Sequence, residues 1–159
     1  MKKTILILIT IILILTFSSI QLKGSEGLKV FANFGLITDD SFTFTDYMWY
    51  AGANLDFHIN DLIMFSPEIN LMTYKFDFKA FFVEPAVLLN FKLGTVFAGG
   101  GLTKIFLVSG HNFGATTDFA LKLNAGFRSA HMRFRVFVIT PFGNIFGENL
   151  VGVQFGLGF

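Results

Sequence analysis

Residues 118–128 read DFALKLNAGFR, the clearest example of a pattern that recurs along this chain. Every second residue from Phe119 to Phe127 is apolar, whereas Lys122 and Arg128 lie on the alternate positions. Successive side chains of a β-strand point to opposite faces of a sheet, so a period of two predicts a strand with two different faces. An amphipathic helix would instead repeat its apolar residues every three or four positions.

The same alternation recurs throughout the chain after Ser25. Eight segments show it: 27–38, 46–59, 62–75, 80–93, 95–107, 117–128, 132–141 and 149–159. No stretch of this region keeps a helical period, so we expect almost no helix there. The connections after the second, fourth and sixth segments are tight, at Asn60-Asp61, around Gly94 and at 129–131, and the other four are longer. Short turns at one end and longer loops at the other are typical of an antiparallel membrane barrel.

Composition indicates which face of these strands meets which solvent. The chain of 159 residues is 53% hydrophobic and 14% charged, whereas an ordinary soluble domain is about 25% charged. In each alternating segment, one row of side chains is apolar and the other is more polar. The more polar row holds Gly, Ala, Asn and Gln with isolated charges, whereas the exterior of a soluble protein would be dense with Lys and Glu. Lipid requires strands of about 9–11 residues and a closed ring that leaves no backbone group unpaired. The sequence therefore predicts an all-β fold, a closed eight-stranded antiparallel transmembrane β-barrel.

The first residues are expected to form a targeting segment rather than part of the barrel. Lys2 and Lys3 precede an apolar run from Thr4 to Phe17, and smaller, more polar residues follow. This is the layout of a cleaved secretory signal peptide. We therefore divide the chain into a signal peptide at 1–24 and a barrel domain at 25–159; an uncleaved membrane anchor is the alternative interpretation.

Residue usage argues against several other functions. The chain has no Cys, which excludes disulfides and thiol chemistry. Three of its 12 basic residues precede Ser25, which leaves nine basic against 11 acidic residues and argues against a nucleic-acid partner. The three His are scattered without metal-ligand spacing, and Ser109 and His111 form a close Ser/His pair in a Gly-flanked loop. We expect no metal, no cofactor and no enzymatic activity.

The polar row should face the barrel interior and the apolar row the lipid. We expect Leu55, Phe57, Val87, Leu89, Leu121, Leu123, Val153 and Phe155 to point outward, and Gln154 inward. An interior network of charged side chains is expected from Asp56, Glu68, Glu84, Lys104, Lys122, Arg128, Arg133 and Arg135. Charges in a narrow lumen must be paired or hydrated. Glu68 and Glu84 are expected near mid-barrel, where Arg135 and Lys122 could reach across to them. Counting from the Gly94 turn, we expect Glu84 to be level with Lys104 and to pair with it, which would help to close the lumen.

The end of the chain carries a further pattern. The last nine residues read VGVQFGLGF and place Val153, Phe155, Leu157 and Phe159 on one row. Together with the signal peptide, they resemble the small eight-stranded outer-membrane barrels of the outer membrane protein A and X type and the opacity-like porin superfamily, over residues 25–159. The resemblance implies a bacterial outer-membrane location, contact with outer-membrane lipid, and recognition of these four residues by the barrel-assembly machinery.

Three functions remain open from the sequence. A monomeric barrel with a structural role in envelope integrity is the leading interpretation, because eight strands enclose an interior just wide enough for side chains to fill. A narrow porin-like channel for ions or small solutes is the second. The third is a surface protein that binds partners through its outer loops, although loops of about four to ten residues offer little surface.

Overall fold

The computed structural model describes residues 28–39, 47–110, 112–115, 118–142 and 149–159. The signal peptide expected at 1–24 lies outside the described residues. Within the described ranges, no helix is long and apolar enough to cross a membrane. The strands are β1 (Leu28–Asp39), β2 (Met48–His58), β3 (Ile63–Tyr74), β4 (Ala80–Leu93), β5 (Val96–Thr103), β6 (Phe106–Ser109), β7 (Asn112–Ala115), β8 (Ala120–Arg128), β9 (Met132–Pro141) and β10 (Leu150–Gly158).

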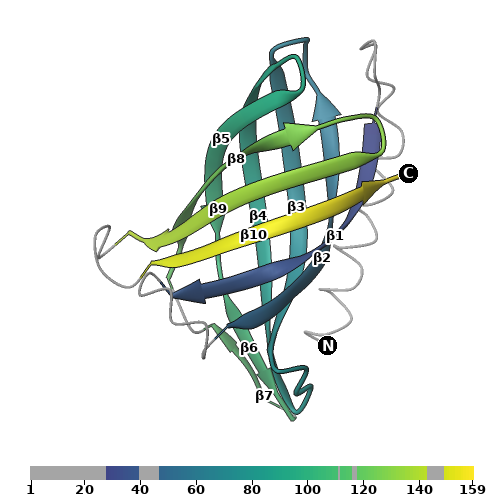
Figure 1. Cartoon of the computed structure of the whole chain (residues 1–159). Helices are drawn as coiled ribbons and strands as arrows, with labels where there is room; N and C mark the ends of the chain where they lie inside the picture. Colours follow the sequence, from purple (N-terminus) through teal and green to yellow (C-terminus); the bar gives the residue numbers. More distant parts are fainter. Residues whose placement is uncertain (1–27, 40–46, 111, 116–117, 143–148) are drawn as a thin grey trace, which may run out of the picture.

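The strands form a closed antiparallel ring (Figure 1). Its order is β1-β2-β3-β4-β5-β8-β9-β10, and the pairing of β10 with β1 closes it. In that last pairing Phe34 lies opposite Phe155 and Gly35 opposite Gln154. Closure leaves no open sheet edge in the ring, so every strand finds a partner on both sides. The predicted eight-stranded barrel, with its first strand paired to its last, is confirmed.

The fifth strand of the ring is interrupted, which the sequence did not predict. β5 ends at Thr103 and β6 begins at Phe106, yet both pair with β4 in one register, with Ala86 opposite Thr103 and Val83 opposite Phe106. The break lies opposite Pro85. The Lys104 N–H donates to the Pro85 carbonyl at 3.3 Å, but proline has no N–H with which to return the bond, and the ladder stops.

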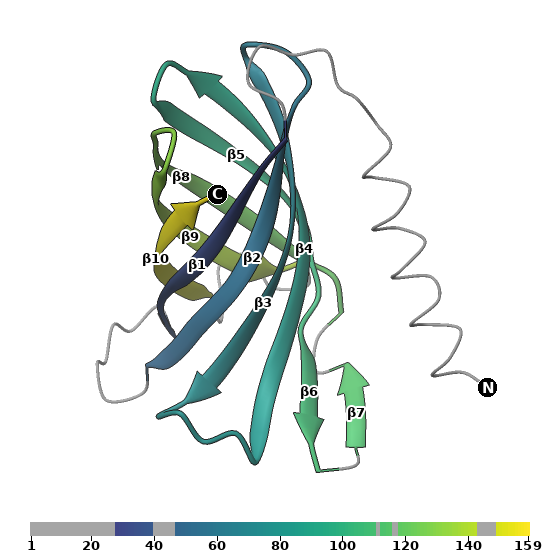
Figure 2. The same cartoon turned by 90° about the vertical axis from the view of Figure 1, so that its right-hand side faces the viewer.

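Beyond this break, a short hairpin replaces the loop expected after the fifth segment. β6 pairs with β7, and Phe106 stacks on Phe113 with ring centroids 5.1 Å apart. The β6–β7 hairpin extends from the long-loop end of the ring (Figure 2). It lengthens the wall beside β4 but adds no ninth strand to the ring.

The three tight turns lie at the opposite end, as predicted. Asn60 Oδ1 accepts hydrogen bonds from the N–H groups of Leu62 and Ile63 in the β2–β3 turn. Gly94 has a φ of +62° in the β4–β5 turn, a conformation that glycine adopts readily. In the β8–β9 turn, Ser129 Oγ accepts from the Met132 N–H. We call this end of the barrel the short-turn end.

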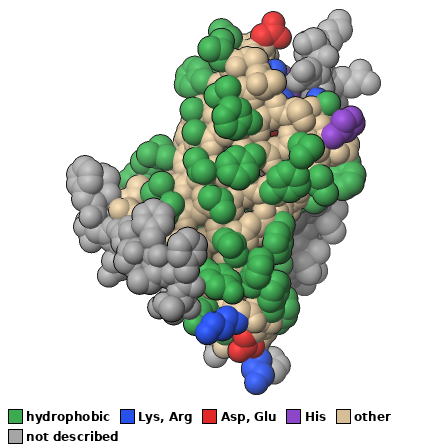
Figure 3. All heavy atoms as spheres, in the orientation of Figure 1, with side chains coloured by type: hydrophobic (Ala, Val, Ile, Leu, Met, Phe, Trp, Pro, Cys, Tyr) green, Lys and Arg blue, Asp and Glu red, His purple; other side chains and the backbone are tan. Residues whose placement is uncertain are grey.

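The barrel is apolar outside and polar inside. On β8 the side chains of Lys122 and Arg128 are buried, whereas Leu123 and Phe127 are exposed. Leu89, Val153 and Phe155 on other strands are likewise more than 40% exposed. Figure 3 shows one flank covered by hydrophobic side chains, with charged ones visible mainly near the two ends. This distribution is the reverse of that in a soluble barrel and confirms the transmembrane fold class.

One residue of the predicted outward set differs from the rest. Phe57 lies next to Asp56 on β2, on the outward row, but is only 4% exposed. Its ring lies 6.1 Å from that of Phe65 on the neighbouring strand.

Glycines on the inward row allow neighbouring strands to lie close together. A Cβ added at Gly101 on β5 would clash with the backbone carbonyl of Val87 on β4, and one at Gly99 with that of Leu89. Gly99 and Gly101 therefore mark a close approach between the backbones of β4 and β5.

Candidate functional site

The centre of the barrel is occupied by the ammonium group of Lys122. Its Nζ lies 2.5 Å from Glu68 Oε1 and 3.0 Å from both carboxylate oxygens of Glu84. It also donates to the hydroxyl of Tyr50 at 2.5 Å. The side chains of Lys122, Glu68 and Glu84 are fully buried. A buried charge is stable only when it is paired and hydrogen-bonded, and Lys122 meets both conditions.

Glu84 receives neutral donors from three other strands. The Tyr50 hydroxyl donates to Glu84 Oε2 at 2.5 Å, and the Asn70 amide donates to the same oxygen at 2.8 Å. Thr103 Oγ1 donates to Glu84 Oε1 at 2.5 Å. Strands β2, β3, β4, β5 and β8 are thus joined across the lumen through this one carboxylate and Lys122.

Glu68 joins the centre to the far wall. Arg135 Nη1 on β9 lies 2.7 Å from Glu68 Oε2, while Lys122 holds the other oxygen. Gln154 on β10 donates to Asn70 Oδ1 at 3.4 Å. We refer to Tyr50, Glu68, Glu84, Lys122 and Arg135 as the central network.

A second cluster lies nearer the short-turn end. Asp56 faces two guanidinium groups, Arg128 Nε at 3.2 Å and Arg133 Nη1 at 3.1 Å. Asn54 and Ser66 also donate to Asp56 Oδ1, at 2.6 and 2.8 Å. One carboxylate is therefore shared by two arginines on adjacent strands.

Aromatic rings line the space around these cations. Lys122 Nζ lies 4.6 Å from the ring centroid of Phe137, and the Arg133 guanidinium lies 4.6 Å from that of Phe97. Cation–π contacts of this kind contribute about 2 kcal/mol when desolvated. The rings therefore fill the remaining space and stabilise the positive charge at the same time.

An apolar cluster closes the lumen on the long-loop side of Lys122. It consists of buried residues from five strands and the β5–β6 break: Ile37, Tyr50, Met72, Ile105, Ala120, Phe137 and Ile139. Tyr50 and Phe137 belong to both the cluster and the surroundings of Lys122, with ring centroids 4.9 Å apart. Ions leaving the central network toward the long loops would meet this apolar packing.

The expected pair of Glu84 and Lys104 is wrong. The register from the Gly94 turn puts Lys104 opposite Pro85, on the outward row, and Thr103 is the inward neighbour that reaches Glu84. Lys104 Nζ lies 5.0 Å from the ring centroid of Phe119, an exposed residue. Lys104 therefore does not belong to the interior network. Lys122 is the lysine that pairs with Glu84.

The other seven residues of the expected network lie inside the barrel. Asp56, Glu68, Glu84, Lys122, Arg128, Arg133 and Arg135 are each 7% exposed or less. They carry four positive and three negative charges. The neutral residues Tyr50, Asn70 and Thr103 were not singled out from the sequence. The alternation along β2, β3 and β5 nevertheless places all three on the inward row.

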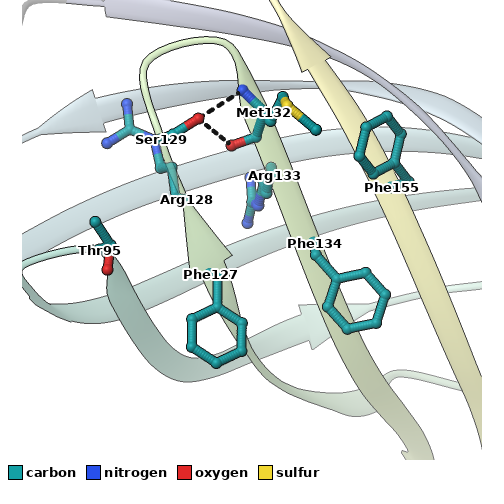
Figure 4. Close-up of a pocket in the computed structure, with 8 residues that line it drawn as sticks. All are labelled: Thr95, Phe127, Arg128, Ser129, Met132, Arg133, Phe134 and Phe155. Carbon is teal, nitrogen blue, oxygen red and sulfur yellow. Dashed lines mark hydrogen bonds between the residues drawn. The ribbon is translucent and has the colours of Figure 1, made fainter.

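The four alternating residues of the expected assembly signal lie on the outer surface of β10 and just beyond it. Val153, Phe155 and Leu157 are 41–52% exposed and Phe159 is 83% exposed. Figure 4 shows Phe134 on β9 between Phe127 on β8 and Phe155 on β10. They line a surface cavity of about 280 Å³ on the apolar flank. This row is accessible to lipid or to another protein.

Among the described residues, no group of three or more His, Asp and Glu side chains could hold a metal ion. The buried carboxylates are bound by lysine, arginine or hydroxyl groups. The arrangement can hold strands together and fill the lumen.

Comparison with solved structures agrees with the fold. A de novo designed transmembrane β-barrel superposes with a TM-score of 0.55 at 7% identity, covering 82% of this chain and 95% of the design. The N-terminal β-barrel domain of Pseudomonas aeruginosa OprF gives 0.48 at 12% identity, with 84% and 98% covered. Neisserial surface protein A gives 0.46 at 8% identity, with 82% and 94% covered. No protein-family model and no curated protein matches the sequence.

Proposed function

We propose that this chain is a monomeric bacterial outer-membrane protein with a structural role in envelope integrity. Its apolar flank contacts outer-membrane lipid, and its filled lumen adds a rigid element to the membrane without opening a path through it. The row from Val153 to Phe159 serves as the signal that the barrel-assembly machinery reads during insertion.

The observation that carries this proposal is the connected interior. Lys122, Glu68 and Glu84 are fully buried and bridge opposite walls, and the apolar cluster lies beyond them. A lumen packed in this way resists solute passage, whereas a porin of 16–18 strands leaves a water-filled channel.

The charged lumen also favours a second candidate, a narrow ion channel. The polar side chains form an almost continuous series from Arg128 at the short-turn end to Glu84. Such a series becomes an ion path only if the Lys122 contacts break and the apolar cluster separates.

A gene deletion in the source bacterium tests the structural role. We expect the deletion strain to take up more of a membrane-impermeant dye and to become more sensitive to detergent, because the membrane loses a rigid component. The wild-type gene and a Lys79→Gln gene should both restore resistance, since Lys79 is exposed in the β3–β4 loop. An unchanged barrier in the deletion strain contradicts the structural role, and slower uptake of small solutes would favour the channel.

A further inference from the structure

Lys104 places a positive charge on the lipid-facing row of the barrel wall. The charged side chains of the ten described strands all lie on the inward row. Lys104 lies between β5 and β6, opposite Pro85 on the outward row, and its side chain is half-buried. A cation on the lipid face is costly at mid-membrane and nearly free at the interfaces. The depth of Lys104 therefore decides which part of the lipid it meets.

The geometry of β5 gives this depth. Val96, the first residue of β5, is 47% exposed at the short-turn end, and Lys104 comes eight residues after it. Strands of such barrels rise about 3.4 Å per residue and are tilted by about 40°, so Lys104 lies about 20 Å farther along the membrane normal. The apolar band of these barrels is about 25 Å tall. Lys104 thus lies just inside the boundary of this band on the long-loop side.

Two aromatic rings mark the same boundary. Lys104 Nζ lies 5.0 Å from the ring centroid of Phe119 and 5.9 Å from that of Phe106. Aromatic side chains are enriched at the interfaces between membrane and water, and the face of a ring attracts an ammonium group. The two rings therefore hold the ammonium at the surface of the wall, at the level of the lipid head groups.

No carboxylate of the described residues neutralises this ammonium group. The side-chain contacts of Lys104 are those with the two rings. Glu84, on the strand opposite, points into the lumen, and Asp118 is exposed but forms no ion pair with Lys104. The other described acids at this end are Asp39, the last residue of β1, and Asp77, in the β3–β4 loop. An ammonium group has three N–H donors, and those of Lys104 are available to an acceptor from outside the chain.

The flank on the short-turn side of Lys104 is apolar. Leu102 on β5, Val87 on β4 and Leu123 on β8 point outward and are 48–50% exposed. An acyl chain that lies along these side chains brings the head group of its lipid to the height of Lys104. The wall therefore offers an apolar surface for the chain of a lipid and a cation for its phosphate.

We propose that Lys104 binds the phosphate group of a phosphorylated glycolipid in the outer leaflet of the outer membrane. The longer loops of these barrels lie on the outer side, so the boundary next to Lys104 belongs to the outer leaflet. A phosphate oxygen accepts a charge-assisted hydrogen bond from Lys104 Nζ while the Phe119 ring stays beside the ammonium. The proposal depends on the outer-membrane location and is independent of the structural role proposed above.

Native mass spectrometry of the refolded full chain in micelles of an uncharged detergent tests the proposal. Lipid A with two phosphate groups is the probe, and phosphatidylglycerol and phosphatidylcholine are the comparison lipids. Lys104→Gln removes the charge, and Lys104→Arg retains it. The matched control is Lys79→Gln, which removes an exposed cation in the β3–β4 loop. Heat-modified gel mobility verifies that each variant is folded.

We expect Lys104→Gln to bind lipid A about tenfold more weakly than wild type, because one charge-assisted hydrogen bond is lost. Lys104→Arg and Lys79→Gln should bind lipid A as wild type does. Equal retention of lipid A by wild type and Lys104→Gln overturns the proposal, and so does an equal loss in Lys79→Gln. A loss confined to phosphatidylglycerol also overturns it, because the ligand is then a phospholipid and not the glycolipid.

Discussion

Replacing Lys122 with methionine is expected to reduce the free energy of unfolding by about 3–5 kcal/mol, the usual result of removing one partner from a buried ion pair. Arg135 still faces Glu68 in this variant. Glu84 keeps only neutral donors, from Tyr50, Asn70 and Thr103. Urea unfolding of protein refolded in lipid vesicles measures the loss.

A double variant shows whether the loss comes from the stranded carboxylate. Adding Glu84→Gln to Lys122→Met removes the uncompensated charge and should recover most of the stability, since removing both partners is often nearly neutral. Lys79→Met, at an exposed position of the β3–β4 loop, should change stability by less than about 0.5 kcal/mol. The single variant Glu84→Gln is measured as well. If the stability losses of Lys122→Met and Glu84→Gln simply add in the double variant, the two residues are not coupled and the description of the central network is wrong.

Placing arginine at Leu123 should reduce stability by about 2–4 kcal/mol and slow insertion, because a cation on the lipid face at mid-membrane is costly. Leu123 is 48% exposed near the middle of β8, where it lies between Gly100 and Val138 of the adjacent strands. Heat-modified gel mobility after refolding into vesicles reports the inserted fraction, and urea unfolding reports stability.

Two substitutions separate charge from packing and depth. Leu123→Ala removes the same side chain without adding charge and should insert normally. Leu93→Arg, at an exposed position beside the β4–β5 turn, should cost only about 0–1 kcal/mol because it lies at the end of the barrel. If Leu93→Arg and Leu123→Arg impair insertion equally, the flank around Leu123 does not face lipid.

Much of the fold follows from period-two alternation alone. The segments predicted at 80–93 and 132–141 have the bounds of β4 and β9 in the structure. The inward positions of Asp56 and Lys122 follow from the same alternation. The lipid-facing row of a membrane barrel must be apolar over its whole length, so the charged residues belong to the other row. The tight turns at Asn60 and Gly94 were recognisable from residue types that turns favour.

The expected reach of Lys122 and Arg135 across mid-barrel to Glu68 and Glu84 is confirmed. The exact partner of each carboxylate was not predicted, because it depends on contacts between strands far apart in the sequence. Lys122 is 38 residues from Glu84 and 54 from Glu68, and parity alone does not say which inward cation reaches which carboxylate across the lumen. The wrong pairing of Glu84 with Lys104 is a one-residue error in register. Such an error moves a side chain to the other face of the sheet.

The interruption between β5 and β6 had a signal in the sequence, the proline at position 85, but the segment around it alternates like any other strand. Pro85 removes one ladder hydrogen bond in the strand opposite, but its effect on β5 appears only when the β4–β5 register is known. The short β7 strand depends on pairing with β6, and the Gly and Asn residues of this region were interpreted as a loop.

Single-channel recording of the refolded wild-type protein in a planar lipid bilayer shows whether the lumen is closed to ions. The central network and the apolar cluster together fill the lumen, so we expect no sustained conductance steps once insertion is verified by gel mobility. A steady, ohmic open state of the wild-type protein would contradict the filled lumen and show that the barrel conducts ions.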